Sequence, residues 1–195
     1  MLSCILLAAG QSQRFGSVKA LALIEEQPLI RRLQQTILSA DIGELIIVLG
    51  AHSDKIEPYL LNHSQVVIVH NKDHNFGQTS SFQCGLRRLD PAANGIMLLP
   101  VDYPFLTKET LVQLSAAFAT NTSNIIIPVF NGRRGHPPVF PVTMVREILD
   151  LPVTEGLNTV QHRYADCCQE CPVTDPGVVA TFNTPQELTA LLKDL

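Results

Sequence analysis

The sequence predicts an α/β protein with a single doubly wound, mostly parallel sheet that carries helices on both faces. Three observations support this fold class. Short apolar runs alternate with helix-like segments along the chain, and the connections between them are short, as in repeated βα units. Several of the runs are apolar without interruption, which is typical of parallel strands buried on both faces. The expected strands are residues 4–9, 45–49, 66–69, 96–101 and 125–129.

The expected helices are marked by their first residues and by their apolar spacing. Pro28 opens a helix whose apolar face ends before Gly43, and Thr107 caps a helix that runs to about residue 118. The sequence Thr-Pro-Gln-Glu at 184–187 combines a threonine cap, a first-position proline and a third-position glutamate. Helical spacing also indicates helices over residues 54–61 and 79–89.

Composition restricts the classes of function. The 195 residues are expected to form one domain over 1–195, and 46% hydrophobic with 16% charged residues excludes a disordered chain. A net charge of −4 offers no basic surface for a nucleic acid. No apolar stretch approaches the ~20 residues that span a bilayer, and no signal peptide is expected. A cytoplasmic protein without a nucleic-acid or membrane partner is therefore predicted.

The first strand ends in a loop suited to phosphate. Residues 10–19 are rich in small side chains, which let backbone N–H groups approach a ligand closely. Arg14 can bind phosphate with its fork of donors, and Lys19 adds a point charge. The spacing is that of neither a P-loop nor the dinucleotide G-x-G-x-x-G motif. The segment therefore predicts a triphosphate cradle, the alternative being an ordinary strand followed by a basic loop.

This opening resembles L-A-A-G-x-S-x-R-x-G-x-x-K, the start of the nucleotidyltransferases that act on molybdopterin and of related MobA-like NTP transferases. The resemblance implies a Rossmann-like fold that binds a nucleoside triphosphate here, with Arg14 and Lys19 acting in catalysis. The positions that match the pattern are Leu7, Ala8, Ala9, Gly10, Ser12, Arg14, Gly16 and Lys19. The resemblance implies that all of these except Gly16 bind the nucleotide.

Asp102 directly follows the strand 96–101, between Pro100 and Pro104. A carboxylate placed so stiffly is a hard oxygen ligand suited to Mg²⁺ beside phosphates. The segment resembles the family's L-x-x-D-x-P-x-L run, whose aspartate coordinates the metal, so the resemblance implies a catalytic metal ligand. The alternative is an aspartate that only caps the turn after a strand.

Asn183 stands immediately before the Thr-Pro dipeptide of the last helix. The resemblance places a second metal ligand here, aspartate in the cytidylyltransferase branch and asparagine in the guanylyltransferase branch. An asparagine carbonyl can bind Mg²⁺ but supplies no charge. A turn residue in front of a helix is the alternative.

Two further clusters resemble the family. Residues 77–86 are similar to its G-M-x-x-S-L-x-x-G-L helix start, with Gln78 in place of methionine, and Ser80 or Ser81 is implied to contact the nucleotide. These hydroxyls could instead cap their own helix. Residues 134–140 are similar to R-G-H-P-V-x-F with one extra proline, which implies that Arg134 and His136 bind the acceptor.

A zinc site is one interpretation of the cysteines at 167, 168 and 171, because His162 lies only five residues ahead of them. His162 falls in an expected helix, however, and an expected strand begins near Cys171. Only one C-x-x-C is present, whereas a structural zinc site needs four ligands. Free thiols are expected for all five cysteines.

The resemblance implies transfer of CMP from CTP to molybdopterin or its molybdenum form, with Mg²⁺ as cofactor, release of pyrophosphate and a molybdoenzyme as a partner. CTP is favoured over GTP because alanine at position 9 takes space that a purine would need. Three alternatives stay open: a GTP-dependent enzyme, a nucleotidyltransferase for another phosphorylated acceptor, and a non-catalytic nucleotide-binding protein that delivers the cofactor.

Overall fold

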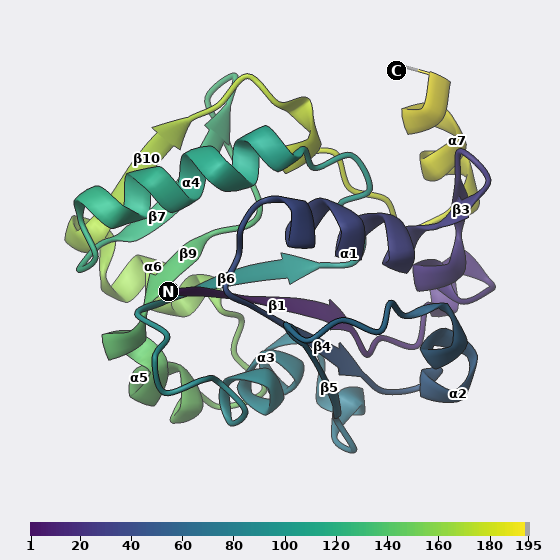
Figure 1. Cartoon of the computed structure of the whole chain (residues 1–195), viewed down its shortest axis with the longest axis horizontal. Helices are drawn as coiled ribbons and strands as arrows, with labels where there is room; N and C mark the ends of the chain where they lie inside the picture. The colour runs from purple at the N-terminus through teal and green to yellow at the C-terminus, as the bar shows by residue number, and fades with distance from the viewer. Residues whose placement is uncertain (194–195) are drawn as a thin grey trace.

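The computed structural model describes residues 1–193, and its centre is an eight-stranded sheet with helices on both sides (Figure 1). The strands run in the order β10-β7-β9-β6-β1-β4-β5, with β8 paired to β7, and β2 with β3 forms a separate hairpin. Their bounds are β1 Leu2–Ala8, β2 Leu23–Ile24, β3 Gln27–Pro28, β4 Glu44–Leu49, β5 Val66–His70, β6 Gly95–Pro100, β7 Ile125–Phe130, β8 Arg133–Arg134, β9 Val139–Pro141 and β10 Cys168–Pro172.

The order of the sheet reverses at β1. From β1 the chain adds β4 and β5 on one side, and it then returns to place β6 on the other, with β1 parallel to both β4 and β6. In open α/β sheets, ligands bind outside the carboxyl ends of the strands where the order reverses. The predicted fold class is confirmed, and the topology puts the ends of β1 and β6 side by side.

The sheet is not parallel throughout. β9 lies between β6 and β7 and is antiparallel to both, and β8 is antiparallel to β7. Strands of two or three residues carry too few positions for an apolar period. Prolines at 137 and 138 also make the approach to β9 read as a loop. Neither strand was therefore expected from the sequence.

The helices begin largely where the sequence places them. Thr107 caps α4 by accepting a hydrogen bond from the Thr110 amide. Thr184 and Glu187 accept each other's backbone N–H at the start of α7, at 3.2 and 3.3 Å. None of the helices within residues 1–193 is long and apolar enough to cross a membrane. The helix bounds are α1 Leu29–Ser39, α2 Ser53–Ile56, α3 Gln78–Leu86, α4 Lys108–Thr120, α5 Val145–Leu149, α6 Asn158–Arg163 and α7 Pro185–Lys193.

The core forms two layers, one on each face of the sheet. Successive strand residues point to opposite faces, so Leu6 packs in the layer under α1 and α4, and its neighbour Ile5 packs in the layer with α3 and α5. Figure 1 shows α1 and α4 on one side of the strands and α3 and α5 on the other. Burial on both faces explains why the central strands are apolar throughout.

Candidate functional site

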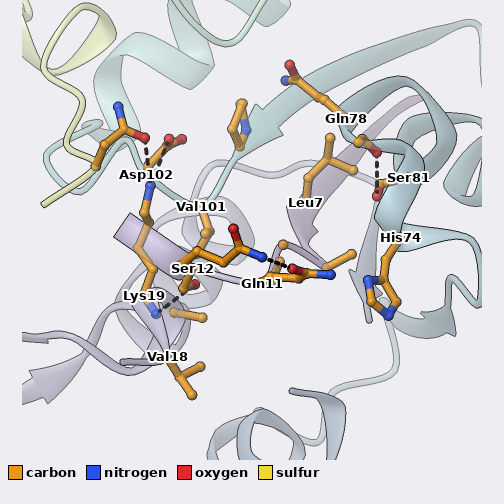
Figure 2. A pocket seen from close by; sticks show the side chains of 18 of the residues that line it. Leu7, Gln11, Ser12, Val18, Lys19, His74, Gln78, Ser81, Val101 and Asp102 are labelled. Atoms are coloured by element: carbon orange, nitrogen blue, oxygen red, sulfur yellow. Dashed lines mark hydrogen bonds and ion pairs between the residues drawn. The ribbon is translucent and has the colours of Figure 1, made fainter. Parts of the chain in front are cut away.

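A cleft of about 1000 Å³ opens at the carboxyl ends of β1 and β6 (Figure 2). One end holds Lys19 and Asp102, and the other holds His74, Gln78 and Ser81. Of the residues implied by the sequence to form the site, those lining this cleft are Leu7, Ala8, Ala9, Gly10, Ser12, Arg14, Lys19, Ser81, Asp102, His136 and Asn183.

The loop after β1 is held in shape by its own serine. Ser12 adopts a left-handed backbone conformation, with φ of 52°. Its carbonyl accepts the Phe15 amide at 3.0 Å, and its hydroxyl accepts the Lys19 amide at 3.1 Å. Phe15 is buried and packs edge-on against Phe182, with 5.4 Å between ring centroids. Together these contacts fix the loop against the segment that carries Asn183.

Lys19 joins three segments that are distant in the sequence. Its Nζ lies 3.3 Å from Oδ2 of Asp102, 3.2 Å from Oδ1 of Asn183 and 2.8 Å from the carbonyl oxygen of Phe182. The ammonium also lies over the Phe182 ring, 5.2 Å from its centroid. Arg14 donates a hydrogen bond to the same Asn183 oxygen at 3.1 Å. The fold therefore brings the expected phosphate-binding cations and the expected metal ligands into direct contact.

The ligand set at Asp102 fits a divalent metal that is shared with a substrate. Oδ1 of Asp102 is buried and has no hydrogen-bond partner, an arrangement that needs an explanation in a native structure. Within residues 1–193, no group of three or more His, Cys, Asp or Glu side chains could hold a metal. Mg²⁺ is usually bound by one or two protein oxygens together with substrate phosphates and water. Asp102 and Asn183 match that mode.

The buried carboxylate of Asp175, which was not expected from the sequence, braces this end of the cleft. Asp175 accepts hydrogen bonds through Oδ2 from the amide and hydroxyl of Thr107 and from the Thr110 hydroxyl, at 2.7–3.0 Å. Its other oxygen accepts the Gly177 amide at 2.7 Å. Because Thr107 closes the loop that begins at Asp102, Asp175 fixes that loop to the chain leading toward Asn183.

The serines at the start of α3 occupy different environments. The Ser81 hydroxyl lines the cleft and donates to the Gly77 carbonyl at 3.2 Å. The Ser80 hydroxyl donates to the Asp73 carbonyl at 2.8 Å, and Ser80 is buried outside the cleft lining. Adjacent helix residues point about 100° apart, so only one of the two can face a ligand. The structure therefore brings Ser81 to the cleft and turns Ser80 inward.

Two residues at this end were not identified from the sequence. His74 and Gln78 both line the cleft, and Nδ1 of His74 is buried without a hydrogen-bond partner. The departure of Gln78 from the family's methionine was the available signal for one of them. His74 lies in a short 3₁₀ turn that carries no periodic pattern.

The loop before β9 brings His136 to the cleft but leaves Arg134 outside its lining. Arg134 is exposed and pairs with Glu170 at 2.9 Å. His136 packs against the Tyr103 ring, with 4.7 Å between centroids, and its Nδ1 lies 3.4 Å from the Leu98 carbonyl oxygen. Burial lowers the pKa of His136, outweighing the Leu98 carbonyl and the Asp102 charge, which both raise it. His136 therefore faces the cleft as a neutral ring at neutral pH.

The melting temperature of the wild-type protein is expected to fall between pH 7 and pH 5, and replacing His136 with glutamine is expected to make that fall smaller. The unfolded chain binds the proton at the ordinary pKa of 6.5, and the folded chain binds it only at a lower pH. Stability linked to His136 is therefore intact above pH 6.5 and is lost as the pH falls below it. Thermal melts across this range measure the effect. The exposed control His162→Gln should keep the wild-type dependence, and an unchanged slope in His136→Gln would refute the expectation.

The cysteines are free thiols, as expected. Burial raises the pKa of Cys168 and of Cys171, and this favours the neutral thiol over the thiolate that binds metals.

The chain is similar to a known protein family and to several characterised proteins. The family model described as the MobA-like NTP transferase domain matches residues 4–167. Nicotine blue oxidoreductase from Paenarthrobacter nicotinovorans is 33% identical over 155 residues, which cover 69% of this chain and 68% of that protein. Molybdenum cofactor cytidylyltransferase from Escherichia coli is 25% identical over 136 residues, covering 70% and 68%.

Solved structures share the fold. Rv0371c from Mycobacterium tuberculosis superposes with a TM-score of 0.86 at 24% identity, over 98% of this chain and 97% of that one. The same protein in complex with manganese gives a TM-score of 0.81 at 22% identity, over 100% and 99%. At these identities the likeness shows the fold alone.

Proposed function

Because the chain belongs to the MobA-like NTP transferase family, we propose that it transfers CMP from CTP to molybdopterin or its molybdenum form and releases pyrophosphate. One observation carries the proposal: Arg14, Lys19, Asp102 and Asn183 converge within hydrogen-bond distance at the point where the sheet order reverses. Cations beside a carboxylate and an amide are the groups that position a triphosphate and neutralise its charge.

In the proposed reaction, an in-line displacement at phosphorus, the residues of the cleft have separate roles. A phosphate oxygen of the acceptor attacks the α-phosphorus of CTP, the bond to the bridging oxygen breaks, and pyrophosphate leaves with the electron pair. Asp102 and Asn183 would hold Mg²⁺, which neutralises charge on the phosphates when bound. Arg14 and Lys19 bind the triphosphate, and the backbone of residues 9–12 cradles it. The chain needs no general base, since the attacking phosphate is already ionised.

A divalent cofactor is supported by the ligand set and by the manganese complex of a protein with the same fold. On the nucleoside side, the end of the cleft away from Lys19 and Asp102 holds no carboxylate, lysine or arginine among its described lining residues, which supports base binding by Ala9 and Ser81. His136 is proposed to contact the acceptor as a neutral hydrogen-bonding ring. Arg134 would have to break its ion pair with Glu170 before it could contact the acceptor beside His136.

Replacing Ala9 with glycine is expected to narrow the preference for CTP over GTP. Ala9 is 2% exposed and lines the cleft, and a Cβ at position 50 would lie only 2.9 Å from the Ala9 Cβ. The wall is therefore tightly packed, and one methyl group in such a pocket discriminates by about 1–3 kcal/mol. The ratio of kcat/KM for the two nucleotides measures the change, with Ala92→Gly as an exposed control. Equal kcat/KM for CTP and GTP in the wild-type protein would show that the wall does not select the base.

The function itself is tested by pyrophosphate release with each nucleoside triphosphate, in the presence and absence of molybdopterin. Release that requires both CTP and molybdopterin is expected. Release with GTP instead would identify the guanylyl enzyme, and release only with a different phosphorylated compound would identify another acceptor. Nucleotide binding without release would identify the delivery protein.

A second candidate function is oxidoreduction, which the 33% identical nicotine blue oxidoreductase favours. Interconversion of the oxidised and reduced forms of nicotine blue by the protein, with no pyrophosphate formed from any nucleotide, would support it over transfer.

A further inference from the structure

The Lys19 ammonium lies between the two side chains that are proposed to hold the divalent metal. Its Nζ is surrounded by three oxygen atoms, from Asp102, Asn183 and the Phe182 carbonyl, at 2.8–3.3 Å. Two of these oxygens belong to the side chains proposed to hold the divalent metal. The Lys19 side chain is only 13% exposed, and Oδ1 of Asp102, the carboxylate oxygen that Lys19 does not contact, is buried. An ion held by Asp102 and Asn183 together would therefore need the ammonium to move.

The charge around this position opposes a divalent cation on its own. Among the described residues that line the cleft, Asp102 is the sole carboxylate, whereas Arg14 and Lys19 are both cationic. Arg14 also donates to the Asn183 oxygen at 3.1 Å. One carboxylate and one neutral amide must therefore attract the metal against two neighbouring positive charges.

A triphosphate reverses that balance. It brings several negative charges and further oxygen ligands for the metal, and it gives the two cations a new anionic partner. Lys19 carries its charge on a flexible four-carbon stem, so the ammonium can move while the backbone stays in place. Its amide remains fixed to the Ser12 hydroxyl at 3.1 Å.

We propose that the divalent cation binds this protein only together with the triphosphate, and that Lys19 gives up Asp102 and Asn183 to the metal as it moves onto the phosphates. The inference rests on the proposed function, because it takes a nucleoside triphosphate as the ligand. Lys19, Arg14 and the neutral Asn183 together keep the free protein from taking up metal, and Lys19 is the one that contacts both proposed ligands.

Binding of Mn²⁺, followed by the relaxation rate of water protons, tests this proposal without turnover. The nucleotide is an α,β-methylene analogue of CTP, and the complex of Mn²⁺ with the analogue alone is the reference. The wild-type protein is expected to leave the relaxation rate unchanged with Mn²⁺ alone and to raise it when the analogue is added. Lys19→Met and Asn183→Asp are each expected to bind Mn²⁺ without nucleotide, about tenfold or more tightly than the wild type.

Two controls match these variants. Lys108→Met removes an exposed lysine, and Asn62→Asp adds a carboxylate at an exposed position; both should behave as the wild type. Circular dichroism confirms that each variant is folded, and Asn183→Asp tests the proposal even if Lys19→Met does not fold.

Equal Mn²⁺ affinity of the wild type with and without the analogue would overturn the proposal while leaving the proposed function intact. The proposal is also overturned, with the proposed function intact, if Lys19→Met and Asn183→Asp bind Mn²⁺ no more tightly than the control variants do. Calorimetry measures binding of the analogue to the wild type, once with a chelator present and once with Mn²⁺. If the analogue binds under neither condition, both this proposal and the proposed function are overturned.

Discussion

Replacing Asp102 with asparagine is expected to lower kcat/KM at least about a hundredfold, or roughly 2.7 kcal/mol of transition-state stabilisation. Asparagine keeps the shape of the side chain but removes the only negative charge proposed to hold the metal. The melting temperature should stay within a few degrees, because the one ion pair that is lost is partly open to solvent, with Asp102 23% exposed. Pyrophosphate release and thermal melts measure the two effects.

The exposed substitution Asp166→Asn serves as the control and should leave both values unchanged. A folded Asp102→Asn protein with near-normal turnover would remove Asp102 from the metal site. A large loss of melting temperature would instead assign Asp102 a structural role.

Replacing Lys19 with alanine is expected to have a comparable effect on activity and also to destabilise the protein. The ammonium donates to three oxygens and covers the Phe182 ring. Its removal takes the donor from the carbonyl of the buried Phe182 and from Asp102, whereas the Asn183 oxygen keeps its hydrogen bond from Arg14. Unsatisfied buried groups cost about 1–3 kcal/mol each, and in a chain of this size one kcal/mol shifts the melting temperature by about 2–4 °C.

Arg14→Ala provides the matched comparison for Lys19→Ala. Arg14 is exposed and makes a single hydrogen bond with Asn183, so its loss should reduce activity with little change in melting temperature. From the sequence alone both side chains appear as equivalent loop cations, and only the structure separates them. Equal melting temperatures for the two variants would contradict the structural role assigned to Lys19.

Long buried strands and capped helices could be predicted from the sequence because each carries a local signature. The run 45–49 is apolar throughout, and the threonines at 107 and 184 cap their helices as their neighbours indicate. β9 could not be predicted, since it has three residues and follows two prolines. Its place is set by pairing with β6 and β7, which is a property of the assembled sheet.

The convergence of Lys19, Asp102 and Asn183 follows from the sequence once the sheet topology is known, because the segments carrying them meet at the carboxyl end of the sheet. The sequence could not show that Lys19 lies between the other two, since that depends on side-chain packing around Phe182. Asp175 was missed for a related reason. The Asp-Pro-Gly run at 175–177 indicates only the local bond from the Gly177 amide. The three bonds from Thr107 and Thr110 join residues 65–68 positions apart, and no local pattern indicates them.

Nucleotidyl transfer is tested most directly with CTP labelled at the α-phosphorus and incubated with molybdopterin, Mg²⁺ and the wild-type protein. The expected result is that the label appears in a cytidine dinucleotide form of the acceptor while unlabelled pyrophosphate is released in equal amount. Label that stays in CTP, or that appears only in free CMP, would contradict transfer by this cleft.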